Sequence, residues 1–162
     1  MMKRQEGFSL IELLVAVVIM AVGILGIAGL QVVALQQNRS ALLRAEATML
    51  ANDIMDRIRV NTDITYGTLI DAAPADPVNC KNTECNRAEM ADYDIAVWKC
   101  SINHLDADGN THAACTTLGI NGKLPEGAGA INKAGDIYTV TVQWSDDRGD
   151  NTQSVVIRSQ VN

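Results

Sequence analysis

The stretch that decides the fold is Gly7-Phe8-Ser9-Leu10-Ile11-Glu12-Leu13-Leu14, which opens an apolar run continuing to Leu35. Eighteen consecutive residues, Leu13 to Leu30, include no charged or strongly polar side chain. A hydrocarbon core about 30 Å thick needs roughly 20 helical residues, and only a helix satisfies its own backbone groups in lipid. The run therefore predicts a membrane-spanning α-helix.

Glu12 lies inside this apolar region and needs a cationic partner. A carboxylate near the bilayer centre costs about 2.5 to 3.5 kcal/mol on insertion scales, and less near an end. The nearest cations, Lys3 and Arg4, belong to a seven-residue leader that ends at Gly7. Cleavage between Gly7 and Phe8 would create an α-amine close to the carboxylate. Because Glu12 could reach its own amine only by straining the helix, we expect the amine of a neighbouring copy to be its partner.

Other interpretations of this N-terminus stay open. The run could be an uncleaved anchor, or a signal peptide cut after Ala28. In a Sec-type signal, however, the small-residue cleavage site follows the apolar region, whereas Gly7 precedes it. Three glycines within the run could allow close approach of another helix, mark a segment that unwinds, or simply be tolerated in a membrane helix: Gly23, Gly26 and Gly29.

The leader and the stretch after it resemble the class III signal of type IV pilins and pseudopilins, in which Gly-Phe-Ser/Thr-Leu-Ile/Leu-Glu follows a short basic leader. In that family, prepilin peptidase cleaves after the glycine that corresponds to Gly7 and methylates the new N-terminal residue, here Phe8. The glutamate that corresponds to Glu12 pairs with a neighbour's N-terminus during assembly. The resemblance implies the α+β type IV pilin fold, in which a long N-terminal helix packs on a small C-terminal antiparallel β-sheet head with an additional helix.

The residues after Leu35 change from uniformly apolar to one-sided. Apolar residues recur at intervals of three and four with charged residues between them, which predicts an amphipathic continuation of the helix to about Val60: Leu43, Ala47, Leu50, Ile54 and Ile58. The expected organisation is a leader peptide (1–7), a transmembrane or filament-core helix (8–35), the amphipathic continuation (36–60) and a globular periplasmic or extracellular head (61–162).

The first half of the head should contain a loop and a second helix. Residues 61–79 are loop-like, because Gly67 and two prolines break any period. A helix is expected over Asn86–Leu105, where apolar residues recur at helical spacing. Asn86 and Glu89 form a capping-box pattern at its start, and Trp98 lies in the apolar stripe as a core anchor.

Two turns are expected after this helix. The stretch Asp106-Ala107-Asp108-Gly109-Asn110 fails as an EF-hand loop, because Gly109 is fourth rather than sixth and the twelfth residue is Thr117 rather than Glu. We interpret it as a turn. Asn121-Gly122 is typical of a second, tight turn.

The remainder should form a β-hairpin. Residues Ile137–Trp144 alternate between apolar and polar, and Thr152–Val161 alternate again through Val155 and Ile157. The polar residues 146–151 would form the turn between them. The apolar face of this hairpin can bury the stripe of the long helix.

Charge and motif content disfavour nucleic-acid binding and catalysis. The net charge is −6, and removing Lys3, Arg4 and Glu6 with the leader makes it −7. An acidic ectodomain lacks the electrostatic footprint for phosphate backbones. No histidine accompanies a nucleophile-like Ser or Cys, and there is no Gly-rich phosphate loop. We expect His104 and His112 to be exposed, and no enzymatic activity.

The four cysteines predict disulfides rather than a metal site. They all follow the apolar run, which suits an oxidising compartment, and they permit three pairings. Spacings of five, fifteen and fifteen residues contain no Cys-x-x-Cys, so we expect no metal and no cofactor. The favoured pairs each close a local loop, although the sequence leaves the connectivity open: Cys80 with Cys85, and Cys100 with Cys115.

The ectodomain as a whole is similar to minor pilins of the PilV type. Residues 99–121 look like an insertion relative to that pattern and carry the second cysteine pair. The resemblance runs through five segments in order: Leu50–Asn61, Cys80–Cys85, Asp94–Trp98, Leu124–Ile131 and Tyr138–Asp146.

This resemblance implies a role in assembly. Such minor pilins join the major pilin, other minor pilins and an inner-membrane assembly complex to prime pilus formation, and some lie at the tip with effects on adhesion and twitching motility. The implied location is a single-pass inner-membrane protein with a periplasmic head, and the pilus fibre or tip after assembly. The competing classes are a type II secretion pseudopilin with the same N-terminus, a head with an adhesive or ligand-binding role, and a membrane-tethered enzyme.

Overall fold

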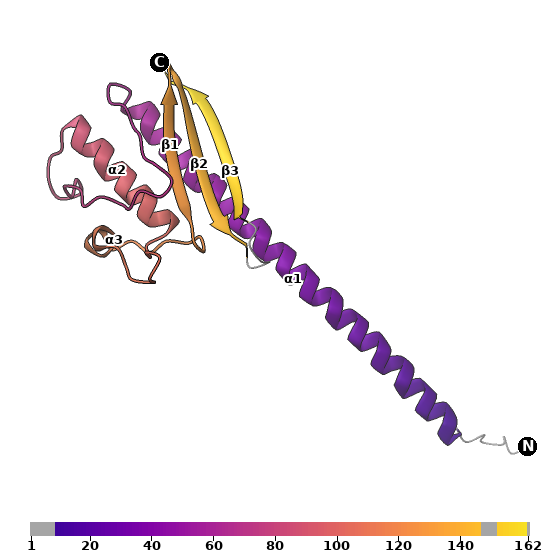
Figure 1. Ribbon diagram of the computed structural model, residues 1–162. Coiled ribbons are helices and arrows are strands. Elements are labelled where there is room, and N and C mark those ends of the chain that lie inside the picture. The colour runs from indigo at the N-terminus through magenta and orange to yellow at the C-terminus, as the bar shows by residue number, and fades with distance from the viewer. Residues whose placement is uncertain (1–8, 147–151, 162) are drawn as a thin grey trace, which may run out of the picture. The chain divides into compact units, whose positions relative to one another are not determined.

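The computed structural model describes residues 9–146 and 152–161, and it has an α+β architecture (Figure 1). The chain divides into two compact units, Met1–Ala41 and Leu42–Asn162, which we call the N-terminal unit and the C-terminal unit. The helices and strands follow in this order: α1 (Leu10–Val60), α2 (Arg87–Ile102), α3 (Ala113–Leu118), β1 (Ala128–Ala134), β2 (Ile137–Ser145) and β3 (Thr152–Gln160).

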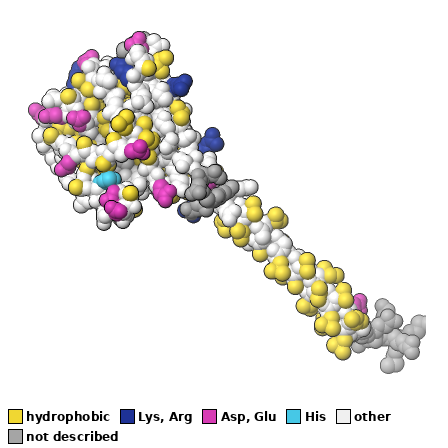
Figure 2. Space-filling model, viewed as in Figure 1, with side chains coloured by type: hydrophobic (Ala, Val, Ile, Leu, Met, Phe, Trp, Pro, Cys, Tyr) yellow, Lys and Arg dark blue, Asp and Glu magenta, His cyan; other side chains and the backbone are white. Residues whose placement is uncertain are grey.

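The described part of the N-terminal unit is helical, as predicted. Its first turn closes where the N–H groups of Glu12 and Leu13 donate to the carbonyl of Ser9, at 3.1 and 3.3 Å. The aliphatic side chains from Leu10 to Leu35 are exposed, and hydrophobic atoms cover this part of α1 in Figure 2. An 18-residue window of α1 has a mean hydropathy of 2.9, so the helix is long and apolar enough to cross a membrane.

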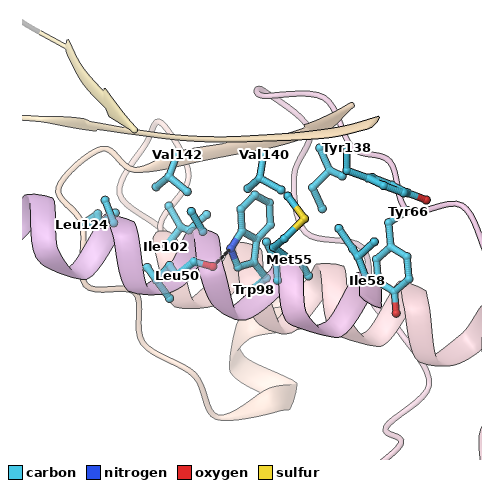
Figure 3. Close-up of a cluster of buried hydrophobic side chains, with 14 of the residues drawn as sticks. Leu50, Met55, Ile58, Tyr66, Trp98, Ile102, Leu124, Tyr138, Val140 and Val142 are labelled. Carbon is cyan, nitrogen blue, oxygen red and sulfur yellow. Dashed lines mark hydrogen bonds between the residues drawn. The ribbon is translucent and has the colours of Figure 1, made fainter. Parts of the chain in front are cut away.

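The C-terminal unit buries the amphipathic stripe of α1. Ala47, Leu50, Ile54 and Ile58 are buried as predicted, and Leu43 is half-buried. They pack with Trp98 and with side chains from the inner face of the sheet (Figure 3). The predicted packing of the sheet on the stripe of the long helix is thus confirmed.

Helix α2 begins where the sequence predicts. The Asn86 carboxamide oxygen accepts from the N–H groups of Ala88 and Glu89, at 2.9 and 3.0 Å, and the Glu89 carboxylate accepts from the Asn86 N–H at 2.8 Å. The capping box is therefore confirmed. Trp98 is fully buried, and its indole Nε1–H donates to the Leu50 carbonyl at 2.8 Å.

The predicted end of α2 is wrong by three residues. The helix stops at Ile102, because Asn103 is extended (φ −148°, ψ 129°) and its side-chain oxygen accepts from the Leu105 N–H at 3.1 Å. Leu105, which was expected in the apolar stripe, forms an isolated β-bridge with Thr111 and is 37% exposed.

The segment after α2 contains one predicted turn and one unpredicted helix. Asp106 closes the turn, since its carboxylate accepts from the N–H groups of Asp108 and Asn110 at 2.9 and 2.8 Å, and Gly109 has φ 81°. Helix α3 has six residues and was missed, because so short a helix has no measurable periodicity.

Asn121-Gly122 does not form the predicted tight turn. This segment runs beside the end of α2, where the Gly122 N–H donates to Nδ1 of His104 at 2.9 Å and the Lys123 N–H donates to the Ser101 carbonyl at 3.2 Å. A Cβ atom at Gly122 would lie 2.4 Å from the Cα atom of Asn103. Glycine is needed here for close backbone approach, not for a turn.

The sheet has three antiparallel strands in the order β1-β2-β3. The predicted alternation of β2 is confirmed, because Tyr138, Val140, Val142 and Trp144 are buried and the residues between them are not. Strand β1 was not predicted. The β2 and β3 strands pair from Ile137↔Gln160 to Ser145↔Thr152, and most of the predicted 146–151 turn lies outside the described residues.

Candidate functional site

The candidate assembly site is the start of α1. Glu12 is the only charged residue between Gly7 and Arg39 in the sequence, and it lies in the first turn of the helix, where the macrodipole favours a carboxylate. Its side chain is exposed in the single chain. Gly7 and Phe8, the predicted processing residues, lie outside the described residues. The result is an apolar helix with one anionic side chain close to its N-terminal end.

The glycines of the apolar segment have open space around them. A Cβ atom added at Gly23, Gly26 or Gly29 would meet no heavy atom within 4 Å. Contacts within a single chain therefore do not require glycine at these positions. Close approach of a neighbouring helix stays a prediction.

A polar network lies where α1, α2 and the 61–79 loop meet. One carboxylate oxygen of Asp94 accepts from Nη1 of Arg57 at 2.7 Å, and the other accepts from the Tyr66 hydroxyl at 2.8 Å. The Asn61 side-chain amide donates to the Tyr66 oxygen at 3.2 Å and to the Arg87 carbonyl at 2.8 Å. Asp94 and Asn61 are buried, so these bonds satisfy groups that would otherwise be costly to bury.

This network was not predicted from the sequence, although a signal for Asp94 was present. Asp94 lies three residues after Ala91 and four before Trp98, both on the buried stripe of the helix. An acid on such a stripe needs a partner, as Glu12 does. Its partner Tyr66 lies in a loop without any period, so the pairing itself could not be read from the sequence.

The phenol of Tyr66 gives this network a measurable pH dependence. Burial raises the pKa of Tyr66 from 10.0 to about 12. The contribution of this phenol to the free energy of unfolding is therefore fully present below pH 10, its pKa in the unfolded chain. It is lost as the pH rises towards 12. We expect a loss of about 2 kcal/mol in the free energy of unfolding over this window. Urea titrations followed by tryptophan fluorescence at pH 9 to 12 would measure it.

Tyr66→Phe is the matched control for that measurement. It retains the ring but has nothing to ionise, so its stability should change less between pH 10 and 12, while the other two tyrosines contribute equally to both proteins. Parallel pH curves for the two proteins would contradict the prediction.

Lys99 ties the 61–79 loop to α2. Its Nζ atom donates to the carbonyl oxygens of Leu69, Ile70 and Ala72, at 2.7, 3.4 and 2.5 Å, and the residue is 6% exposed. Burial lowers the pKa of Lys99 to about 8, an effect that the nearby Asp71 charge opposes. The amine is engaged by main-chain oxygens, so it acts as a structural clamp.

Two disulfides hold the irregular parts of the C-terminal unit. Cys80 is bonded to Cys85 in the loop before α2, and Cys100 is bonded to Cys115, which joins α2 to α3. These are the two pairs favoured from loop length. In the chain-entropy model, a disulfide that closes a 15-residue loop stabilises the folded state by about 3 kcal/mol, because it constrains the unfolded chain.

The two histidines are more enclosed than expected. His104 and His112 are each half-buried, and the ring of His104 accepts the Gly122 N–H described above. The prediction that both are exposed is wrong. Residues 120–124 pack back against the end of α2 beside His104, and the His112 N–H donates to the His104 carbonyl at 2.9 Å. Within residues 9–146 and 152–161, no group of three or more His, Cys, Asp or Glu could hold a metal ion.

Two family models match the chain. The model described as Tt1218-like, type IV pilin Tt1218, matches residues 29–96, and the model of the prokaryotic N-terminal methylation motif matches residues 2–28. Searches of the curated proteins and of the solved structures found no match. The first model covers α1 from Gly29 onward, the loop after it and α2 as far as Ala96. The second covers the leader from Met2 onward, Glu12 and most of the apolar run.

Proposed function

We propose, from the support that both matches give to a type IV pilin, that this chain is a minor pilin that helps to prime and assemble type IV pili. The long apolar helix, the three-stranded antiparallel sheet and the extra helices fit the α+β type IV pilin fold. Pilins are structural rather than enzymatic proteins.

One observation carries this proposal: a lone carboxylate in an apolar helix, placed five residues into the chain that cleavage after Gly7 would leave. Prepilin peptidase would cleave between Gly7 and Phe8 and methylate the amine of Phe8. That amine stays cationic and can pair with Glu12 of an adjoining subunit. The pair removes the cost of an isolated charge in lipid, so it favours transfer of the helix from the membrane into a helix bundle.

The proposed location follows from the same features. Lys3 and Arg4 before the apolar run favour a cytoplasmic leader by the positive-inside rule. The C-terminal unit would then be periplasmic before assembly, an oxidising compartment that suits its two disulfides. In this arrangement, residues 8–35 lie in the membrane or the filament core, 36–60 support the head, and 61–162 form most of it.

The finer assignment, a minor pilin of the PilV type, rests on the resemblance of five segments between Leu50 and Asp146 to such proteins. Its partners would be the major pilin, other minor pilins and the inner-membrane assembly complex, with a place at the pilus tip. Deleting the gene should remove surface pili and leave protein secretion intact. The reverse result would assign the chain to the type II secretion pseudopilins.

Processing can be tested directly by mass spectrometry of the N-terminal peptide. We expect the protein from cells with prepilin peptidase to begin at Phe8 and to carry one methyl group on its amine. Gly7→Leu should stay uncleaved, because the peptidase site is lost, whereas Ser9→Thr should be processed normally. A mature N-terminus beyond Gly29, or an uncleaved wild-type chain, would contradict the proposed function.

A further inference from the structure

Strand β3 lies at an edge of the sheet, and its outer side has no strand partner among the described residues (Figure 1). The opposite edge is different. There, the N–H of Thr68 donates to the Ile131 carbonyl at 3.1 Å, and the N–H of Ile131 donates to the Thr68 carbonyl at 3.0 Å. The loop after α1 therefore covers part of the β1 edge, while β3 is left open.

The register shows which backbone groups of β3 face outward. A two-residue loop, Gly135-Asp136, joins β1 to β2, so Ala134 and Ile137 close the hairpin as a hydrogen-bonded pair. Because hydrogen-bonded and non-hydrogen-bonded pairs alternate in antiparallel sheets, the even-numbered residues of β2 direct their backbone groups toward β3. Ile131, opposite Val140, is then left free to bond Thr68, as is observed.

The same alternation continues into β3. The even-numbered residues of β2 pair with odd-numbered residues of β3, as in Val140↔Ile157 and Val142↔Val155. The even-numbered residues of β3 therefore direct their N–H and C=O groups away from the sheet. In the middle of the strand these are Ser154, Val156 and Arg158.

This edge has only one of the features that normally protect an edge strand, a single charged side chain. Natural edges are short, or carry charged side chains, lysine above all, proline, bulges or inward-pointing charges. Strand β3 has nine residues, pairs with β2 without a bulge, and contains no proline, lysine or acid. Its single charge is Arg158, and Val156 is 52% exposed. An exposed row of unpaired backbone donors and acceptors is what strand addition requires.

We propose that the free edge of β3 accepts an extended strand from the head of another pilus subunit, which continues the sheet. The class of partner rests on the proposed function. A second copy of this head could supply an acid to face Arg158, the one cation on β3, because residues 42–162 of this chain carry ten Lys and Arg against seventeen Asp and Glu. An acidic side chain on the added strand would pair with Arg158 and so fix the position of the added strand along β3.

The test uses the full chain in piliated cells, with a photo-crosslinking residue at Ser154. We expect crosslinks from position 154 to another pilus subunit in the wild-type background. Val156→Pro removes one outward N–H and leaves the bonds to β2 in place, so it should reduce these crosslinks at least tenfold. Val156→Thr retains the N–H and a β-branched side chain, and should crosslink like the wild type.

Amide exchange gives a second measurement that does not depend on how well Val156→Pro folds. Outward amides of Ser154, Val156 and Arg158 should exchange at least tenfold more slowly in assembled pili than in the isolated chain. The Lys133 amide on the β1 edge serves as the internal control. Unchanged exchange at all three positions, or wild-type crosslinking by a folded Val156→Pro chain, would overturn the proposal.

The outcomes also separate this proposal from the proposed function. A wild-type chain that is present in pili but neither crosslinks from position 154 nor shows protected β3 amides refutes strand addition alone. A wild-type chain that is absent from pili refutes both proposals.

Discussion

Glu12→Ala is expected to reduce incorporation into pili by more than tenfold while leaving membrane insertion and cleavage at Gly7 intact. Removing one partner of a desolvated, hydrogen-bonded charge pair costs about 2 to 5 kcal/mol. Each 1.4 kcal/mol corresponds to about a tenfold change in an equilibrium constant. The variant would leave the cationic amine of a neighbour's Phe8 unpaired in the helix bundle. Immunoblots that compare the amount of the variant in sheared pili with its amount in total membranes would measure incorporation.

Two further variants show whether charge is the cause. Glu12→Gln keeps the size of the side chain and removes only its charge, so it should assemble as poorly as Glu12→Ala. Gln31→Ala removes a polar group from the same helix without changing any charge, and should incorporate normally. If Glu12→Ala reached wild-type levels in pili, the carboxylate would have no role in assembly.

Trp98→Ala is expected to lower the free energy of unfolding by about 3 to 5 kcal/mol, the usual cost of truncating a buried aromatic residue. The side chain is fully buried between α1 and the sheet (Figure 3). The indole also packs closely against β1, because a Cβ atom added at Gly129 would lie 2.6 Å from its Cη2 atom. Urea unfolding of the full chain in detergent, followed by far-ultraviolet circular dichroism, would measure the change.

Trp98→Phe separates packing from hydrogen bonding in that experiment. It keeps an aromatic ring in the core but loses the bond from the indole to the Leu50 carbonyl, which is worth about 1 kcal/mol. The decrease in the free energy of unfolding should therefore be clearly smaller for Trp98→Phe than for Trp98→Ala. A loss below about 1 kcal/mol for Trp98→Ala would show that the core can close over the missing ring.

The long helix, its buried stripe and the second strand could be predicted because each is a periodic pattern in one continuous segment. The assembly site was predictable for a related reason, since a single acid within an apolar run is visible without any knowledge of the fold. The structure of one chain adds little to that site, because the expected partner of Glu12 belongs to another subunit.

The missed features depend on contacts between distant segments. Strand β1 begins Ala128-Gly129-Ala130, which has no β-branched residue, and it becomes a strand because β2 pairs with it and Trp98 packs under Gly129. The early end of α2 is the exception, because there the Asn103 side-chain oxygen accepts locally from the Leu105 N–H. The open edge of β3 could not be inferred before the strand order and register were known.

The interior of the C-terminal unit uses no described residue before Leu43. A polypeptide that starts at Leu42 would therefore keep every side chain of this core, together with both cystines. It would lose the aliphatic surface that requires lipid or detergent. Such a fragment should be soluble in aqueous buffer and suitable for crystallisation, and it would allow binding partners of the head to be screened without a membrane.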